Sequence, residues 1–213
     1  MRVIGLGASG HGKVMIDALR VIGGHEIVGL LDPNRALWGT RILDVPVLGD
    51  DDRLQELYSS GVRHAFIGVG SGADTANRRR IYELVTARGF TVVDTVHPRA
   101  FVAPSATIGA GATVLAHAVV NAAARVGDNV LVNTSAVVEH DCVIGNHVHL
   151  ATAARLAGTV TVGDGAHIGI GATVRQGVRI GACAIIGAGA VVLEDVLDRT
   201  VVVGVPARPL RSA

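Results

Sequence analysis

The chain has 213 residues, of which 49% are hydrophobic and 28 are glycine, while only 3% are aromatic and 17% are charged. A core built from this composition must consist of small and branched aliphatic side chains, which excludes a helical bundle with aromatic anchors and a disordered chain. The formal net charge is +1, so the chain has no basic surplus with which to bind a phosphate backbone non-specifically, and nucleic acid is not expected as a partner.

Residues 1–96 alternate short apolar runs with helical spacing, which predicts a small Rossmann-like α/β domain with a parallel sheet. The expected strands are 2–6, 26–31, 64–69 and 91–96, and the expected helices are 12–23, 51–60 and 77–88. Residues 97–213 follow a different period, so the domain boundary is expected between residues 96 and 97.

A glycine-rich loop follows the first expected strand. Gly5-Leu6-Gly7-Ala8-Ser9-Gly10 fits the dinucleotide-binding fingerprint, and Asp32 closes the second strand where an acidic residue would meet a ribose. The same glycines, extended to Gly12-Lys13, almost form a phosphate-binding loop, but Val14 replaces the Ser or Thr that would hold magnesium, which disfavours ATP hydrolysis. Gly68-Val69-Gly70 is a second glycine loop, expected at the same crevice. We therefore expect a nucleotide or nucleotide-sugar site, with a tight turn that binds nothing as the alternative.

From residue 102 a strict period of six replaces the helical spacing. Every sixth residue is aliphatic through sixteen consecutive positions, from Val102 to Val192, and the residue four places after each is small or modest in size. Gly or Asn is frequent one place after the aliphatic residue, and we expect these positions to be corners with positive φ. Three hexapeptides then make one triangular turn of about 18 residues, as is typical of the left-handed parallel β-helix of hexapeptide-repeat proteins.

His140 departs from the repeat because it lies between Glu139 and Asp141, in a corner where most repeats have small residues. A carboxylate beside an imidazole orients the ring and raises its basicity, so this constellation suits a general base. A solvated corner histidine with acidic neighbours is the structural alternative.

His147, His149 and His167 form a second group of histidines. Because His149 and His167 are 18 residues apart, they are expected at stacked positions on the outward face of adjacent coils. A zinc site between subunits, as in the γ-class carbonic anhydrases that share this architecture, would need a pair of histidines four residues apart, which this stretch lacks. We therefore expect no metal, and we interpret His167 as a weakly buried residue of the outer face.

Cys142 and Cys183 are the only cysteines and lack metal-ligand spacing, so we expect two packed thiols and no disulfide framework. No apolar stretch of about 18 residues is free of Gly and charge, and the first residues pass directly into a strand rather than a signal peptide. We therefore expect a cytoplasmic protein without membrane insertion.

Four motifs together indicate a family. They are Gly7-Ala8-Ser9-Gly10-His11-Gly12-Lys13, then His97-Pro98 leading to Val102-Ala103-Pro104-Ser105-Ala106, then Asn133-Thr134-Ser135 with Glu139-His140-Asp141-Cys142, and finally Val203-Gly204-Val205-Pro206-Ala207-Arg208. Over essentially its whole length the chain resembles the sugar O-acyltransferase family related to the sialic acid O-acetyltransferases, especially its bacterial nucleotide-amino-sugar N-acetyltransferases.

The resemblance implies an acetyltransferase that moves acetyl from acetyl-CoA to the amine of a UDP- or dTDP-linked 4-amino sugar. We expect direct transfer, because no Ser or Cys lies in a recognisable nucleophile setting next to His140 and Cys142 occupies an inward position of the repeat. It implies a homotrimer with acetyl-CoA between neighbouring β-helices, His140 as the general base, and Asp141, one methylene shorter than the usual Glu, as the residue that enhances its basicity. It assigns His149, Gly158, Ile170 and Ala188 to acetyl-CoA, and Ser9, Gly10, His11, Asp32, Gly68 and Asn133 to the nucleotide-linked sugar.

Two alternatives stay open at this point. The acceptor could be the hydroxyl of a sialic-acid-like sugar, which would make the chain an O-acetyltransferase. The chain could also be a non-catalytic nucleotide-sensing or NAD-binding module on an inert β-helix scaffold, because a fold by itself does not determine a function.

Overall fold

The computed structural model describes residues 1–72 and 74–212 of the chain. It divides into two compact units. The first consists of Met1–Gly70 with Asn77–Asp94, and the second of Ser71–Ala76 with Thr95–Ala213. The segment Ser71–Ala76 is thus grouped with the second unit although its neighbours in sequence belong to the first.

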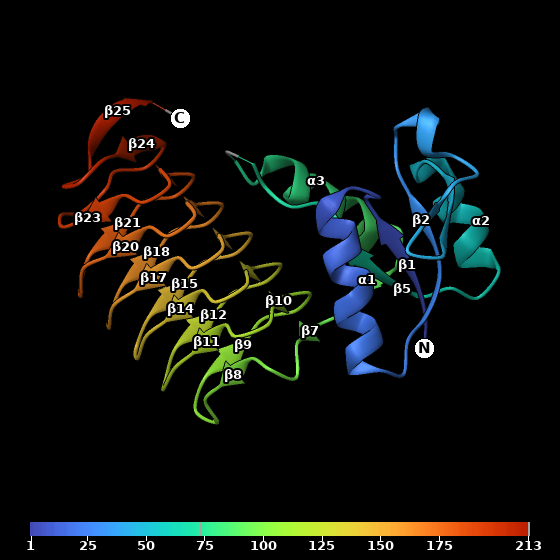
Figure 1. Cartoon of the computed structure of the whole chain (residues 1–213), viewed down its shortest axis with the longest axis horizontal. Coiled ribbons are helices and arrows are strands. Elements are labelled where there is room, and N and C mark those ends of the chain that lie inside the picture. Colours follow the sequence, from blue (N-terminus) through green and yellow to red (C-terminus); the bar gives the residue numbers. More distant parts are fainter. Residues whose placement is uncertain (73, 213) are drawn as a thin grey trace. The chain divides into compact units, whose positions relative to one another are not determined.

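The first unit is built on a six-stranded sheet with the order β3-β4-β2-β1-β5-β6. Figure 1 labels β1, β2 and β5 of this sheet. Its strands are β1 (Arg2–Leu6), β2 (Glu26–Leu31), β3 (Arg41–Ile42), β4 (Val45–Gly49), β5 (His64–Ile67) and β6 (Thr91–Val92). All neighbouring pairs are parallel except β3 and β4, which form an antiparallel hairpin. The parallel α/β architecture predicted for this part of the chain is confirmed.

The α-helices of the first unit are α1 (Gly10–Ile22), α2 (Leu54–Ser59) and α3 (Ala76–Ala87), and two short 3₁₀ helices cover Arg35–Leu37 and Asp51–Arg53. Three details correct the expectations. The expected helix 51–60 begins as 3₁₀, the hairpin β3–β4 has no counterpart in the prediction, and the expected strand 91–96 is two strands. Thr91–Val92 extends the first sheet, whereas Thr95–Val96 (β7) pairs with β10 in the second unit, so two residues between them separate the two units.

The second unit is a parallel β-helix with three faces, which confirms the predicted fold. The first face contains β7, β10 (Thr113–Val114), β13 (Leu131–Val132), β16 (His149–Leu150), β19 (His167–Ile168), β22 (Ile185–Ile186), β24 (Thr200–Val203) and β25 (Arg208–Ser212). The second face contains β8 (Phe101–Val102), β11 (Val119–Val120), β14 (Val137–Val138), β17 (Arg155–Leu156), β20 (Thr173–Val174) and β23 (Val191–Val192). The third contains β9 (Thr107–Ile108), β12 (Arg125–Val126), β15 (Val143–Ile144), β18 (Thr161–Val162) and β21 (Arg179–Ile180).

The core of the β-helix consists of the two inward positions that the repeat predicted. The aliphatic residue of each hexapeptide is the second residue of a strand, and it packs with the small residue four places later in one continuous buried cluster that includes Val120, Ala124 and Val138. Each fully buried aliphatic side chain of this kind stabilises the fold by roughly 1.5–3 kcal/mol. Residues 18 apart are paired in successive coils, as in Val120 with Val138, but the last coil is shorter because Ile186 pairs with Val202.

The prediction that the frequent Gly and Asn one place after the aliphatic residue have positive φ is wrong. Positive φ occurs three places after it, for example at Ser135 (φ 59) and Asp141 (φ 58). The glycines are required for a different reason: a Cβ on Gly127 would lie 2.8 Å from the carbonyl carbon of Gly145 in the next coil. Coils approach so closely at this corner that only Gly fits, whereas the left-handed corner position tolerates several residue types.

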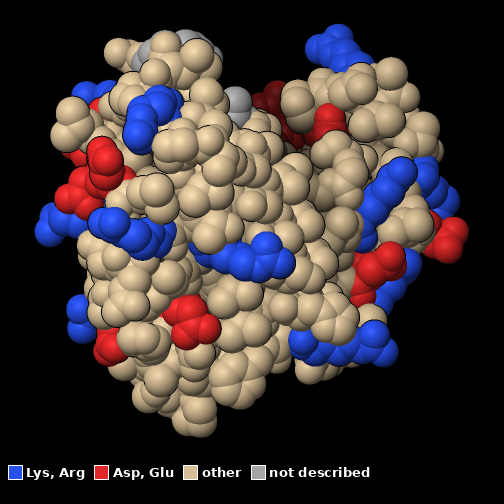
Figure 2. Space-filling model, turned by 60° about the vertical axis from the view of Figure 1, so that its left-hand side comes forward, with Lys and Arg blue, Asp and Glu red and all other residues tan. Residues whose placement is uncertain are grey.

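Acidic and basic side chains are interspersed with large uncharged areas on the face drawn in Figure 2. Within residues 1–72 and 74–212, no helix is both long and apolar enough to cross a membrane.

Candidate active site

His140 lies at the corner between β14 on the second face and β15 on the third. Its Nδ1 is 2.8 Å from Oδ2 of Asp141, and the two side chains are 49% and 58% exposed. The left-handed backbone of Asp141 (φ 58) turns this carboxylate toward the imidazole. The shorter Asp side chain therefore reaches the ring, and the contact leaves Nε2 directed away from the carboxylate, as a general base requires.

Gly158 occupies the position of His140 in the next coil. A Cβ at Gly158 would lie 2.5 Å from both Cε1 and Nε2 of His140, so the imidazole rests on the bare backbone of this glycine. Gly158 is buried. Gly158 was expected to contact acetyl-CoA. In the structure its lack of a side chain leaves the space that the His140 ring occupies.

Hydrogen bonds of Glu139 stabilise the corner that carries His140. Glu139 Oε2 accepts hydrogen bonds from the backbone N–H of His140 (3.2 Å) and from Asn121 Nδ2 in the preceding coil (3.0 Å).

Cys142 points inward and is buried, and burial raises the pKa of its thiol. A thiol that is buried and protonated is a poor nucleophile, so Cys142 is not available for covalent catalysis.

The expectation that both cysteines are packed is wrong for Cys183, which is exposed. It occupies a left-handed corner position (φ 54), from which the side chain points away from the core.

His149 is the outward residue of β16 and is only 5% exposed. Its Nδ1 is 2.8 Å from the Ser71 hydroxyl, and its Nε2 is 3.2 Å from Nδ2 of Asn133. Asn133 Oδ1 accepts a hydrogen bond from the backbone N–H of Thr134, which orients the amide so that its NH₂ group faces the imidazole. The expected cofactor residue His149 and the expected sugar residue Asn133 therefore contact each other, and Ser71, which sequence reasoning missed, completes the group.

His149 and His167 are stacked on adjacent coils, as predicted, with ring centroids 4.9 Å apart. His167 is more buried than expected, at 6% exposure, and burial lowers the pKa of its imidazole while Asp74 opposes this effect. The Thr75 hydroxyl donates a hydrogen bond to the carbonyl of Gly165 (2.8 Å), so the segment that carries Asp74 packs on this face. In the described part of the chain, no three His, Cys, Asp or Glu side chains are grouped as a metal site.

Ile170 and Ala188 lie at a different corner from His140. Both follow strands of the first face, β19 and β22, and precede strands of the second face, β20 and β23. Both residues are exposed, Ile170 to 61%. Within one chain, His140 and Ile170 thus lie on two different edges of the three-sided β-helix.

The glycine loop of the first unit is explained by close backbone contacts. A Cβ on Gly12 would lie 2.5 Å from the carbonyl oxygen of Gly7, and a Cβ on Gly68 would lie equally close to that oxygen. These three glycines let the β1–α1 turn and the end of β5 touch. Gly10 differs, because a Cβ there would meet nothing within 4 Å, so packing does not require this glycine and the first turn of α1 stays open.

A cavity of about 260 Å³ lies beside this loop, at the carboxyl ends of β1 and β2. It is lined by Leu6, Gly7, Ser9, Leu31, Asp32, Pro33, Asp51, Val69, Asn77, Arg80 and Ile81. This is the crevice in which parallel α/β sheets bind nucleotides. Asp51, Asn77 and Arg80 were not predicted as site residues, because nothing in their local sequence shows that the fold brings them to the loop.

Ser9 and Asp32, two predicted residues that line this cavity, differ in the hydrogen bonds that their side chains already make. Ser9 is the N-cap of α1 but makes no side-chain capping hydrogen bond, so its hydroxyl is not used by the helix. Asp32 accepts hydrogen bonds from the backbone N–H groups of Ala8 (2.8 Å) and Asn34 (2.9 Å), one on each carboxylate oxygen. Asp32 thus ties the two loops together, and each oxygen keeps a second lone pair for a ligand hydroxyl.

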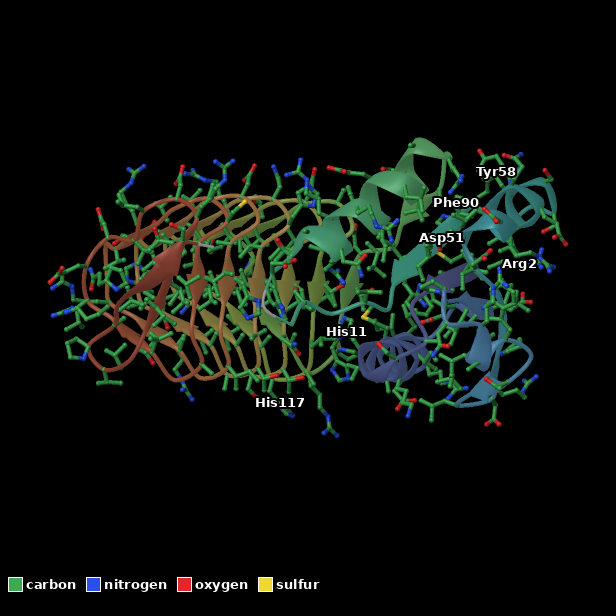
Figure 3. The ribbon with its side chains drawn as sticks, turned by 90° about the horizontal axis from the view of Figure 1, so that it is seen from above. Arg2, His11, Asp51, Tyr58, Phe90 and His117 are labelled. Atoms are coloured by element: carbon green, nitrogen blue, oxygen red, sulfur yellow. The ribbon has the colours of Figure 1, made fainter. Side chains whose placement is uncertain are left out.

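His11 and Gly68 do not line the cavity itself. His11, the second residue of α1 and labelled in Figure 3, has a buried Nε2 with no hydrogen-bond partner among the described residues. Burial, assisted by the nearby charge of Arg78, lowers the pKa of its imidazole to about 3. His11 is therefore neutral at physiological pH. Gly68 is buried against Gly7 and Gly12, while its neighbour Val69 faces the cavity.

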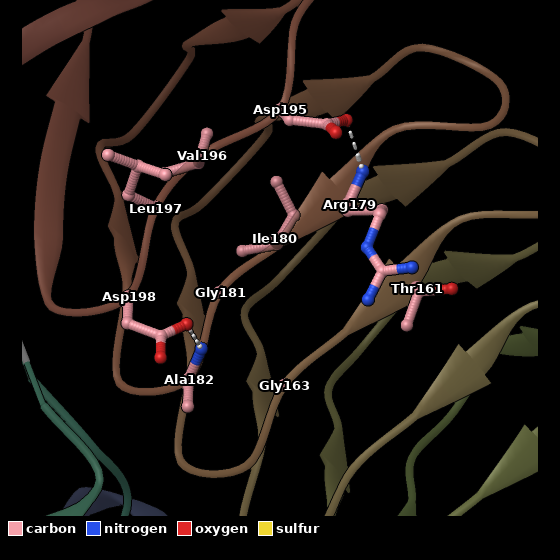
Figure 4. Close-up of a pocket in the computed structure, with 10 residues that line it drawn as sticks. All are labelled: Thr161, Gly163, Arg179, Ile180, Gly181, Ala182, Asp195, Val196, Leu197 and Asp198. Carbon is pink, nitrogen blue, oxygen red and sulfur yellow. Dashed lines mark hydrogen bonds between the residues drawn. The ribbon is translucent and has the colours of Figure 1, made fainter.

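Another cavity, of about 630 Å³, lies on the third face near the end of the β-helix (Figure 4). Its Asp195 and Asp198 accept hydrogen bonds from the backbone N–H groups of Arg179 and Ala182, so both carboxylates serve the fold. None of the residues predicted for catalysis or binding lines it.

Comparison with known families matches both parts of the chain. Residues 2–85 match the PglD N-terminal domain family, and residues 159–194 match the bacterial transferase hexapeptide family.

Solved structures resemble the chain over nearly its full length. A histidine-to-asparagine mutant of perosamine N-acetyltransferase from Caulobacter crescentus, in complex with CoA and GDP-perosamine, is 39% identical with a TM-score of 0.92, covering 100% of this chain and 98% of that chain. The acetyltransferase domain of PglB from Neisseria gonorrhoeae, in complex with acetyl coenzyme A, is 36% identical with a TM-score of 0.89, covering 98% of each chain. WeeI from Acinetobacter baumannii is 27% identical with a TM-score of 0.86, covering 99% of this chain and 100% of that chain.

Proposed function

Because the chain belongs to the hexapeptide-repeat sugar N-acetyltransferases, we propose that it acetylates the amine of a nucleotide-linked amino sugar from acetyl-CoA, with His140 as the general base. The observation that carries the catalytic assignment is the imidazole of His140, held between the Asp141 carboxylate at 2.8 Å and the bare backbone of Gly158.

The reaction is a direct transfer. The sugar amine attacks the thioester carbonyl carbon of acetyl-CoA, and His140 Nε2 takes the proton that the amine loses. The tetrahedral intermediate then collapses with cleavage of the C–S bond, and the CoA sulfur leaves with a proton returned from the imidazolium. Asp141 fixes the orientation of the ring and stabilises its protonated form during this exchange. Cys142 takes no part, because its side chain points into the core.

The nucleotide part of the acceptor binds in the 260 Å³ cavity of the first unit. Ser9 and the open first turn of α1 at Gly10 offer a hydroxyl and backbone N–H groups to the pyrophosphate, and His11 and Gly68 shape the loop behind them. Asp32 accepts from the ribose hydroxyls with its remaining lone pairs.

Acetyl-CoA binds at His149, Gly158, Ile170 and Ala188, the acceptor sugar contacts Asn133 beside His149, and the active unit is a homotrimer. The geometry of one chain supports this assembly, because His140 lies at the corner after the second face while Ile170 and Ala188 lie at the corner before it. A complete site then needs the His140 corner of one subunit and the Ile170 corner of another. The outward residues of the second face support contact between copies, since Phe101, Val119 and Val137 are stacked on three successive coils as an apolar row and Phe101 is 54% exposed.

The test is a thiol-release assay with acetyl-CoA and a panel of nucleotide-linked amino sugars and matching hydroxyl sugars. His140→Gln should lower kcat by roughly 10²–10⁴-fold, the usual range for general-base catalysis, with little change in the KM for acetyl-CoA. Asp141→Asn should lower kcat by about tenfold, since it keeps the shape but removes the charge that stabilises the imidazolium.

Three results would count against the proposal. Near wild-type kcat in His140→Gln would remove His140 as the base. Transfer only to hydroxyl acceptors would make the chain an O-acetyltransferase. Absence of any acetyl-CoA binding, measured as no shift in thermal stability, would favour a non-catalytic module.

A further inference from the structure

The nucleotide cavity carries a carboxylate that the proposed mechanism does not use. Asp51 begins a 3₁₀ helix, and of the consecutive residues Asp51 and Asp52 only Asp51 lines the cavity, while Asp52 is exposed. Among the described residues the Asp51 side chain makes no hydrogen bond and no ion pair within 4.0 Å. The Asp51 oxygens are not among the buried polar atoms that lack a partner, so this carboxylate is accessible in the cavity and is free to accept hydrogen bonds from a ligand.

The groups around Asp51 define what such a ligand can be. Leu6, Leu31, Val69 and Ile81 give the cavity apolar walls that suit a flat ring, and Asn77 and Arg80 add polar groups at the same cavity. Arg80 Nη2 donates to Asn77 Oδ1 (3.3 Å), which holds the guanidinium at the cavity. Burial raises the pKa of the Asp51 carboxyl, and the charges of Arg80 and Arg88 oppose this shift. A carboxylate acceptor and a guanidinium donor therefore line the same cavity, together with apolar side chains.

We propose that Asp51 reads the base of the acceptor nucleotide and selects guanine, so that the substrate is a guanosine-diphosphate-linked amino sugar. This inference rests on the proposed function and adds the base to it. Guanine presents two adjacent donors, N1–H and N2–H, with the O6 acceptor beside them. The two oxygens of Asp51 match the donor pair, and Arg80 matches O6.

The same pair of side chains discriminates against pyrimidines. Uracil and thymine have one ring N–H between two carbonyl oxygens, so the second carboxylate oxygen of Asp51 would face a carbonyl oxygen without a proton between them. A site built to pair with donors rejects a ligand that lacks them, because its own polar group is left unpaired. The ribose and pyrophosphate are common to GDP and UDP, so the difference between these two ligands isolates the base.

The experiment is isothermal titration calorimetry of the full chain with GDP, UDP and dTDP, without sugar or acetyl-CoA. The wild-type protein should bind GDP at least about tenfold more tightly than UDP or dTDP. Asp51→Asn, which is isosteric, should weaken GDP binding by about tenfold or more and leave UDP binding equal or stronger, because an amide can donate to a uracil carbonyl. Asp52→Asn, the exposed neighbour, is the matched control and should change neither affinity.

Two outcomes would overturn the assignment. One is equal binding of GDP and UDP by the wild-type protein. The other is equal weakening of both ligands in Asp51→Asn, which would mean that Asp51 contacts the ribose. Either result would leave the proposed function intact if the thiol-release assay still detects transfer of acetyl to a nucleotide amino sugar. The opposite combination is also distinguishable. If that assay detects no transfer but the protein still binds GDP preferentially, the proposed function is contradicted and the assignment of the base stands.

Discussion

The two units of the molecule place their chemistry in opposite ways. The β-helix repeats one pattern, and its candidate catalytic group is a departure from that pattern, with His140 above Gly158 at the same corner of successive coils. The first unit has no repeat, and its candidate residues meet only through long-range contacts such as that of Asp32 with the backbone of Ala8. In a repetitive fold the exception marks the site, whereas in the α/β unit the site follows from the ends of the strands.

The strongest test of the β-helix side of this comparison is Gly158→Ala. The new Cβ would lie 2.5 Å from Nε2 and Cε1 of His140 and would push the ring off its seat. We expect kcat to fall by about 100-fold, which corresponds to about 2.7 kcal/mol, with thermal stability almost unchanged because the exposed ring can move into solvent. Steady-state kinetics together with thermal denaturation would measure both effects.

Gln176→Ala is the control for this variant, because Gln176 is exposed and occupies the same corner one coil further on. It should leave kcat within about twofold of wild type. An unchanged kcat in Gly158→Ala would show that the position of the His140 ring is not set by this glycine.

The glycines of the first unit provide the next test. Gly12→Ala should destabilise the protein by about 2 kcal/mol, because its Cβ would lie 2.5 Å from the backbone oxygen of Gly7 and neither backbone can move freely. Gly10→Ala is the matched variant in the same turn, where a Cβ meets nothing within 4 Å. It should keep or slightly raise stability, by up to about 1 kcal/mol, and raise the KM for the nucleotide sugar several-fold.

Urea denaturation and steady-state kinetics would separate these two effects. Equal stabilities of Gly12→Ala and Gly10→Ala would contradict the packing explanation of the fingerprint. An unchanged KM in Gly10→Ala would show that the open turn is not part of the binding site.

The smallest expected effect is the pH dependence of stability that His11 causes. Because burial lowers its pKa in the folded state to about 3, from the ordinary 6.5, the unfolded chain binds the proton first. The stabilisation is fully present above pH 6.5 and is lost as the pH falls toward 3, with roughly 1.5 kcal/mol lost between pH 6.5 and 5.

Urea denaturation at several pH values would measure this slope. His11→Gln should flatten it, whereas His117→Asn should not, because His117 is exposed at a corner of the β-helix (Figure 3). A slope that persists in His11→Gln would assign the effect to other groups, of which His167, also with a lowered pKa, is the first to examine.

The period of six was sufficient to predict the inward residues, the 18-residue coil and the stacking of His149 on His167, because each of these depends only on sequence spacing. It also singled out His140. It did not reveal that the imidazole of His140 packs against the backbone of Gly158, because that contact depends on the orientation of the ring across two successive coils. Nor could it show that Ser71, 78 residues away from His149 in the chain, would hydrogen-bond to that side chain.

In the first unit, the order of apolar runs was enough to predict a parallel sheet with a glycine loop after its first strand. Only the tertiary structure showed which glycines are needed for packing, that Asp51 and Arg80 share a cavity with Ser9, and that the short last coil ends the repeat. The physical reason is the distance along the chain over which each kind of interaction acts. Periodicity and turn chemistry act over a few residues and are written locally, whereas a binding cavity is made by side chains that only the completed fold brings together.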